Sequence, residues 1–198
     1  MSTLCRLAYD GRALAFVLPL GLATLLLPRM RSPTVAAWLV GGGLVVIGWS
    51  VRIWSQIHLG YRLPVRMSLT TCGPYRFVRN PIYWANTCVV AGAVTAFGWW
   101  WAVPIAVLWC AGLYAAVVRH EEARLRAWHG RVYRAYYDEV PRWLPRIPAP
   151  GDRCHHRFSP RSLLAEVQVP AVLLPAGVKT FGFTILAAGS ALARSWIL

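Results

Sequence analysis

The sequence predicts an all-α fold, a polytopic transmembrane helix bundle of about five spans. Its composition is the first reason: 57% of the 198 residues are hydrophobic, 14% are charged, and eleven are tryptophan. A soluble domain carries about 25% charged residues. The second reason is a series of long segments without charged side chains, each close to the roughly 20 residues that a helix needs to cross a bilayer.

The clearest spans lie in residues 81–118, which contain no charged side chain. A run of this length accommodates two helices of about 20 residues each, and Gly98 marks the turn between them. The sequence therefore predicts a membrane hairpin with spans near 81–97 and 99–118. A further span is predicted near 34–57, and these elements belong to a core domain over 34–148.

The two ends of the chain are predicted as separate units. Residues 1–33 contain a first transmembrane helix and a loop, because 13–28 is apolar. A signal peptide is the alternative for this segment, but no small-residue cleavage site follows it. Residues 149–198 combine a basic linker with an apolar segment, which is either one more span, a re-entrant piece or a helix in the interface. We favour the additional span.

Charge placement predicts the orientation. The segment 58–80 holds four arginines and 119–161 holds ten. The hairpin puts both segments on one side of the membrane, and the positive-inside rule makes that side cytoplasmic. The net charge of +14 then reflects topology and the anionic headgroups of membrane lipids. We therefore expect membrane lipids and no nucleic acid as partners.

A first polar motif, 73–83, precedes the hairpin. Gly73 and Pro74 indicate a turn, Pro81 suits the first position of a helix, and Asn80 suits its N-cap. Arg79 would add a positive charge where a helix N-terminus already attracts anions. The alternative is that arginines and tyrosines here only anchor the helix at the membrane interface.

A second polar motif follows the hairpin. Glu121 and Glu122 either pair with nearby arginines at helical spacing or accept hydrogen bonds from a cationic or hydroxylated ligand. Apolar and aromatic residues then recur at helical spacing, which predicts an interfacial amphipathic helix over 119–138. Beyond it, Arg142 lies between prolines and faces either a ligand carboxylate or a lipid phosphate.

Together, in this order, these pieces resemble the integral-membrane methyltransferases of the isoprenylcysteine carboxyl methyltransferase and phospholipid methyltransferase group. The matching residues are Gly73-Pro74-Tyr75, Arg79-Asn80-Pro81-Ile82-Tyr83, Glu121-Glu122-Ala123-Arg124-Leu125, Trp128, Gly130, Tyr133, Tyr136 and Val140-Pro141-Arg142-Trp143-Leu144-Pro145. The resemblance covers about 35–147.

The resemblance implies S-adenosylmethionine as methyl donor, bound at the cytoplasmic face, and a lipophilic acceptor that enters from the bilayer. It implies Arg79 and Glu122 as catalytic residues. The cofactor-binding residues that it implies are Gly73, Tyr75, Arg79, Asn80, Pro81, Tyr83, Glu121, Glu122 and Arg142. We expect no metal, because the adjacent Cys154, His155 and His156 are poorly placed to converge on one ion.

Asn80 stands where this family usually has histidine, and asparagine cannot titrate near neutral pH. This favours an acceptor that is already nucleophilic, such as an isoprenylcysteine-like carboxylate, and hence an O-methyltransferase; an aminolipid is the other candidate acceptor. Two further functions stay open: an NADPH-dependent membrane sterol or steroid reductase, which the C-terminal half also resembles, and a non-catalytic membrane scaffold. The oligomeric state stays open as well.

Overall fold

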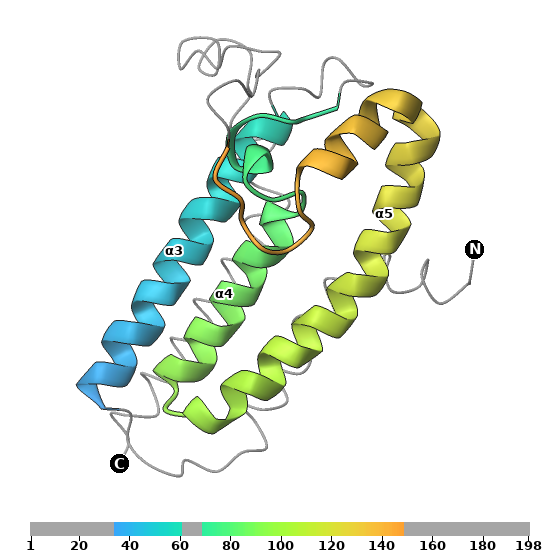
Figure 1. The fold of residues 1–198 in the computed structure, drawn as a ribbon. Helices are drawn as coiled ribbons and strands as arrows, with labels where there is room; N and C mark the ends of the chain where they lie inside the picture. Colours follow the sequence, from blue (N-terminus) through green and yellow to red (C-terminus); the bar gives the residue numbers. More distant parts are fainter. Residues whose placement is uncertain (1–33, 61–68, 149–198) are drawn as a thin grey trace, which may run out of the picture.

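Three long helices lie side by side in the computed structural model, which describes residues 34–60 and 69–148 (Figure 1). They are α3 (Val35–Gly60), α4 (Pro81–Ala96) and α5 (Val103–Glu139), accompanied by two short 3-10 helices, η1 (Gly73–Arg76) and η2 (Trp100–Ala102). Within these described ranges the chain is helical and forms no strand, which confirms the all-α prediction there. The predicted first span and the C-terminal segment lie in 1–33 and 149–198, outside the described residues.

Glycines bring α3 and α4 into close contact. A Cβ atom added to Gly41 of α3 would lie only 2.5 Å from the backbone nitrogen of Ala96 and 2.6 Å from the carbonyl oxygen of Gly92, both in α4. A Cβ on Gly92 would in turn lie 2.6 Å from the Gly41 carbonyl oxygen. Small residues at such crossings let helix backbones approach each other, which is how helices commonly pack in membranes.

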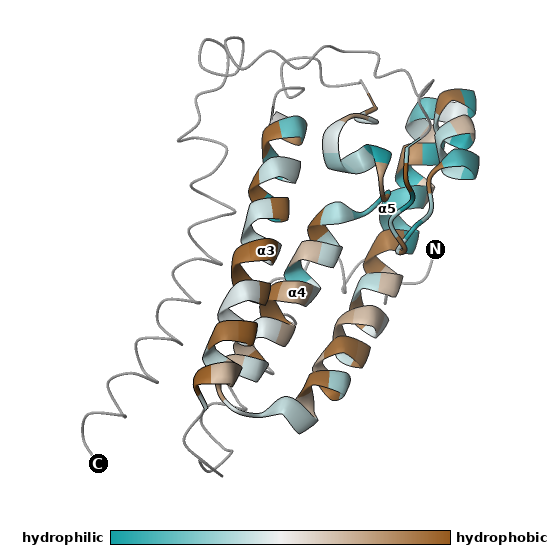
Figure 2. Ribbon diagram, turned by 60° about the vertical axis from the view of Figure 1, so that its left-hand side comes forward, coloured by the Kyte–Doolittle hydropathy of each residue, from teal (hydrophilic) through white to brown (hydrophobic). Residues whose placement is uncertain are grey.

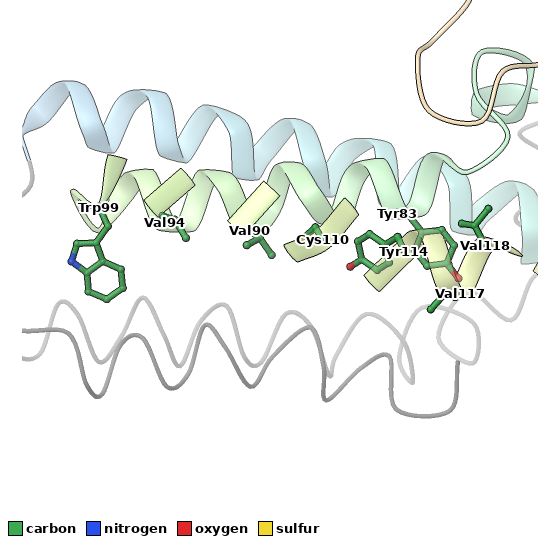
Figure 3. Close-up of a cluster of buried hydrophobic side chains, with 8 residues drawn as sticks. All are labelled: Tyr83, Val90, Val94, Trp99, Cys110, Tyr114, Val117 and Val118. Atoms are coloured by element: carbon green, nitrogen blue, oxygen red, sulfur yellow. The ribbon is translucent and has the colours of Figure 1, made fainter. Parts of the chain in front are cut away.

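The predicted turn at Gly98 is present between α4 and α5. Gly98 has a φ of 79°, a conformation that glycine adopts without steric cost. Its amide donates a hydrogen bond to the Thr95 carbonyl at 2.8 Å. The two helices then pack through one row of buried side chains (Figure 3), formed by Tyr83, Val90, Val94, Trp99, Cys110, Tyr114, Val117 and Val118.

Helix α5 differs from the two helices expected over 99–118 and 119–138, because it continues without a break past residue 118. Its irregular residue is Gly130, with φ 51° and ψ −118°. The expected boundary was placed where charged residues begin, but charge alone does not end a helix, whereas a glycine with positive φ does redirect the chain. Beyond Gly130 the last turns, drawn in orange, fold back towards η1 (Figure 1).

Among residues 34–60 and 69–148, two helices, Val35–Leu59 and Trp100–Glu139, are long and apolar enough to cross a membrane. Only 17% and 22% of their most apolar windows are buried, whereas the core helix of a soluble protein is mostly covered. Large apolar side chains such as Leu39, Val46 and Leu108 are exposed instead. Figure 2 shows hydrophobic colour along the lower parts of α3 and α5 and hydrophilic colour at the opposite end of the bundle. These surfaces suit contact with lipid.

The close contact of α3 and α4 predicts that Gly41→Ala destabilises the protein, because the new methyl group meets backbone atoms that cannot move independently. We expect a loss of about 1–3 kcal/mol in the free energy of unfolding, typical of overpacking, measured in detergent. Gly43→Ala is the matched control, since a Cβ there has no neighbour within 4 Å. Equal stability of the two variants would contradict this packing.

Candidate functional site

The two polar motifs meet at one end of the bundle, where η1, the start of α4, the end of α5 and the segment 140–148 come together (Figure 1). The Arg79 amide donates to the Pro141 carbonyl at 2.9 Å, and the Arg146 amide donates to the Phe77 carbonyl, also at 2.9 Å. The Tyr136 hydroxyl donates to the Tyr75 carbonyl at 2.8 Å, across 61 positions of sequence. The hairpin therefore brings the motifs into direct contact.

Gly73 and Tyr75 support the site through their backbones. Gly73 has a φ of 62°, and a side chain there would overlap the ring of His58 at the end of α3. Tyr75 is buried, and desolvation, with smaller contributions from Tyr136 and Glu121, raises the pKa of its hydroxyl well above the usual value. The Tyr75 hydroxyl is therefore neutral at physiological pH. Neither residue presents a charged group to a ligand.

Asn80 occupies the N-cap position of α4, but its side chain forms no capping hydrogen bond. The predicted N-cap position is confirmed, without the side-chain hydrogen bond that an N-cap residue usually makes. The Asn80 Nδ2 amide instead donates to the Arg142 carbonyl at 3.5 Å, because segment 140–148 runs beside the loop that ends at Asn80. Pro81 is fully buried as the first residue of α4. Asn80 thus connects the first motif to the segment that carries Arg142.

Glu122 lies between two arginines. Its carboxylate accepts two hydrogen bonds from Arg142, from Nη2 at 2.5 Å and from Nε at 3.1 Å, and it forms an ion pair with Arg79 Nη1 at 3.6 Å. Only 4% of Glu122 is exposed. The hydrogen bonds to Glu122 raise the pKa of Arg142, so its guanidinium stays charged. We call Arg79, Glu122 and Arg142 the Glu122 clamp.

The neighbouring arginines make other contacts. The guanidinium of Arg124 lies 4.6 Å from the ring centre of Trp128, and that of Arg126 lies 4.3 Å from the ring centre of Tyr137. Local pairing at helical spacing, the alternative prediction, therefore does not describe Glu122. Its partners come from residues 43 positions before it (122 − 79) and 20 after it.

Arg79 is buried, and only some of its N–H groups have a partner. Just 8% of its side chain is exposed, and its guanidinium lies 3.8 Å from the ring centre of Tyr137. Its Nε and Nη1 atoms are buried and make no hydrogen bond. Nη1 faces the Glu122 carboxylate across the ion pair, whereas no acidic group among the described residues is paired with Nε. Buried polar groups in proteins are nearly always paired, so the Nε–H group is suited to an anionic ligand.

Glu121 points to a different partner from Glu122. The Tyr83 hydroxyl donates to Glu121 Oε1 at 2.7 Å, and the Tyr83 ring packs on Tyr114 with 4.7 Å between centroids (Figure 3). Consecutive helical residues diverge by about 100°, which lets one carboxylate reach α4 and the other reach the clamp. The two carboxylates thus attach α5 to both parts of the first motif.

The structure thus brings Arg79, Asn80, Tyr83, Glu121, Glu122 and Arg142 together, while Gly73, Tyr75 and Pro81 shape the backbone around them. Sequence reasoning missed Tyr137, which carries two stacked guanidinium groups. It also missed Arg52, which lies within the predicted span 34–57 and donates a hydrogen bond to Asn86. A charged residue inside a predicted span was the available signal for Arg52.

Comparison with known proteins adds one finding. Residues 34–131 match the family model described as phospholipid methyltransferase. The match contains Arg79, Tyr83, Glu121 and Glu122, and it ends just beyond the turn at Gly130. No curated protein and no solved structure matches the chain. Residues 34–131, which hold the hairpin and both of its polar ends, are therefore similar to the phospholipid methyltransferase family.

Proposed function

We propose that this protein is an integral membrane methyltransferase that uses S-adenosylmethionine to methylate a lipophilic acceptor at the cytoplasmic face. The observation that carries the proposal is the Glu122 clamp. It holds the buried Arg79 guanidinium, two of whose nitrogens make no hydrogen bond, beside two carboxylates at the polar end of an apolar bundle. The family match favours this function over the NADPH-dependent reductase.

The residues present fit the charged groups of the donor. S-adenosylmethionine carries one carboxylate and two positive centres, an ammonium and a sulfonium. The buried Nε of Arg79, which makes no hydrogen bond and is not the nitrogen that faces Glu122, suits the carboxylate, because a guanidinium and a carboxylate form short charge-assisted hydrogen bonds. Glu121 and Glu122 supply negative charge for the positive centres. When bound, the donor supplies a methyl group that is already activated for transfer.

The chain's own contribution is mainly positioning and exclusion of water. Glu122 and the Tyr137 ring fix Arg79 from two sides, and the Tyr83 hydroxyl fixes Glu121. Groups held in this way orient the reactants and avoid solvent reorganisation, which supplies much of the rate enhancement in a displacement of this kind. We therefore assign Arg79 and Glu122 to binding and orientation of the donor.

The reaction that fits best is O-methylation. Asn80 cannot accept a proton near neutral pH, and its amide is committed to the Arg142 carbonyl. A carboxylate acceptor has a nucleophilic oxygen that needs no base, whereas the amine of an aminolipid must first lose a proton. Asparagine at this position, where the family usually has histidine, therefore favours a lipophilic carboxylate as acceptor.

The arginines of the site support its proposed location at the cytoplasmic face. Arg79, Arg142 and Arg146 lie at the same end of the bundle as the C-terminus of α3, and the positive-inside rule assigns such clusters to the cytoplasm. The exposed apolar side chains of α3 and α5 leave the flanks of these helices open to lipid. An acceptor with a lipid tail would enter from there.

The function is tested by calorimetry with S-adenosylhomocysteine and with NADPH on the full chain purified in detergent. We expect heat of binding from S-adenosylhomocysteine alone, because the site pairs a buried guanidinium with two carboxylates. Binding of NADPH alone would favour the reductase, and binding of neither would favour the scaffold. Either result would overturn the proposal.

Arg79→Met is expected to weaken binding of S-adenosylhomocysteine by about tenfold to a hundredfold, since a charged hydrogen bond contributes about 1.5–3 kcal/mol. The same calorimetry measures this loss. Arg134→Met is the matched control, because Arg134 is exposed on the last turns of α5. Unchanged affinity in a folded Arg79→Met variant would remove Arg79 from the donor site.

A further inference from the structure

A second polar cluster lies inside the apolar part of the bundle, with one residue from each long helix. Arg52 of α3 donates a hydrogen bond from Nη1 to Asn86 Oδ1 of α4, and its guanidinium interacts electrostatically with the hydroxyl of Tyr114 of α5. The Tyr114 hydroxyl lies beside the Asn86 side chain, but it is buried without a hydrogen bond of acceptable geometry. We call these three residues the interior cluster.

The interior cluster lies beneath the Glu122 clamp. Arg52 is seven residues before Leu59, the end of a candidate span, and Tyr114 is seven residues before Glu121, so each lies about 10 Å further into the bundle at 1.5 Å per residue. Tyr83 connects the two levels. Its hydroxyl donates to Glu121, its ring packs on Tyr114, and Arg52 interacts with it electrostatically.

Arg52 carries a charge that its described surroundings do not neutralise. It is 9% exposed and lies within a helix long and apolar enough to span a membrane. Among residues 34–60 and 69–148, no carboxylate forms an ion pair with it; the ion pairs there join Glu122 to Arg79 and Arg142. A charged side chain inside a bilayer is costly, and where one occurs it usually belongs to a functional site. An amide and two phenols can orient such a cation but cannot balance it.

We propose that Arg52, Asn86 and Tyr114 form a carboxylate-binding subsite, and that the acid bound there is the methyl acceptor, a lipophilic carboxylic acid. This deepens the proposed function and rests on it. The planar guanidinium matches a carboxylate with two parallel hydrogen bonds, and the Tyr114 hydroxyl is placed to donate a third. The negative charge of the ligand balances Arg52, while its tail occupies the apolar surroundings.

A carboxylate that binds Arg52 has one other source, the carboxylate of S-adenosylmethionine itself. The buried Nε of Arg79 provides a separate place for that group, which leaves Arg52 for the acceptor. The experiment therefore measures both ligands on the same variants. Neutral hexadecanol serves as the matched probe, because it shares the chain length of palmitic acid and lacks the carboxylate.

The test measures binding of radiolabelled palmitic acid and hexadecanol to the full chain in phosphatidylcholine nanodiscs, at about pH 9 so that the membrane-bound acid is ionised. We expect the wild type to bind palmitate at least about tenfold more tightly than hexadecanol. Arg52→Met should remove this preference, and Tyr114→Phe should reduce it. Arg119→Met, which removes an exposed arginine of α5, should retain it.

Calorimetry with S-adenosylhomocysteine on the same proteins separates the two sources. If Arg52→Met loses the palmitate preference and keeps its affinity for S-adenosylhomocysteine, the result supports the acceptor as the ligand of the subsite. Loss of S-adenosylhomocysteine binding without a palmitate preference in the wild type assigns the subsite to the donor and overturns the acceptor assignment.

Two results would reject the subsite altogether. The first is equal binding of palmitate and hexadecanol by the wild type, together with an S-adenosylhomocysteine affinity that Arg52→Met leaves unchanged. The second is full retention of the palmitate preference in a folded Arg52→Met variant. If Arg52→Met does not fold, Tyr114→Phe decides, because it removes one oxygen and keeps the ring. A wild type that fails to bind S-adenosylhomocysteine would refute the proposed function, and the palmitate measurement would still decide the subsite.

Discussion

The carboxylate of Glu122 is the contact on which the rest of the site depends. It accepts two hydrogen bonds from Arg142 and forms an ion pair with Arg79, so one buried negative charge holds a residue before the hairpin and a residue after it. Two arginines this close would repel each other without it. Hydrogen bonds between the backbones of the two motifs then fix their register. The polar end of the bundle is therefore one unit, although its parts are far apart in the sequence.

The apolar part of the bundle makes this arrangement possible. Gly41 and Gly92 let α3 and α4 touch through their backbones, and the row from Tyr83 to Trp99 packs α4 on α5. The start of α4 is thereby held against the middle of α5, where Glu121 and Glu122 lie. The long α5 crosses the bundle and continues to Gly130, whose positive φ redirects the chain and returns Tyr133, Tyr136 and Tyr137 to the site. A shorter helix would not bring Arg142 back to Glu122.

Much of the fold was predictable from the sequence, because the hairpin and its turn depend on local sequence patterns. Absence of charge over 81–118 predicted the hairpin, Gly98 predicted its turn, and the order of the motifs predicted the family that residues 34–131 match. The pairing within the site was not predictable, because Glu122 has arginines at helical spacing and binds two that are remote in sequence. Asn80 takes the predicted N-cap position, but the partner of its side chain was not predictable for a related reason: its amide bonds to a tertiary partner, the Arg142 carbonyl. Tyr137 and Arg52 were missed because their roles come from neighbours on other segments.

The central claim is that Glu122 and Arg142 act as a pair that joins the two motifs. A double-mutant cycle tests it most directly, using Glu122→Gln, Arg142→Met and the double variant, with the free energy of unfolding measured in detergent. Residues in direct contact couple by about 0.5–3 kcal/mol, and a charged pair with two hydrogen bonds belongs in the upper part of that range. We predict that the double variant is destabilised by at least about 1 kcal/mol less than the sum of the two single variants. Additive effects would show that the motifs are held together without this pair and would contradict the account.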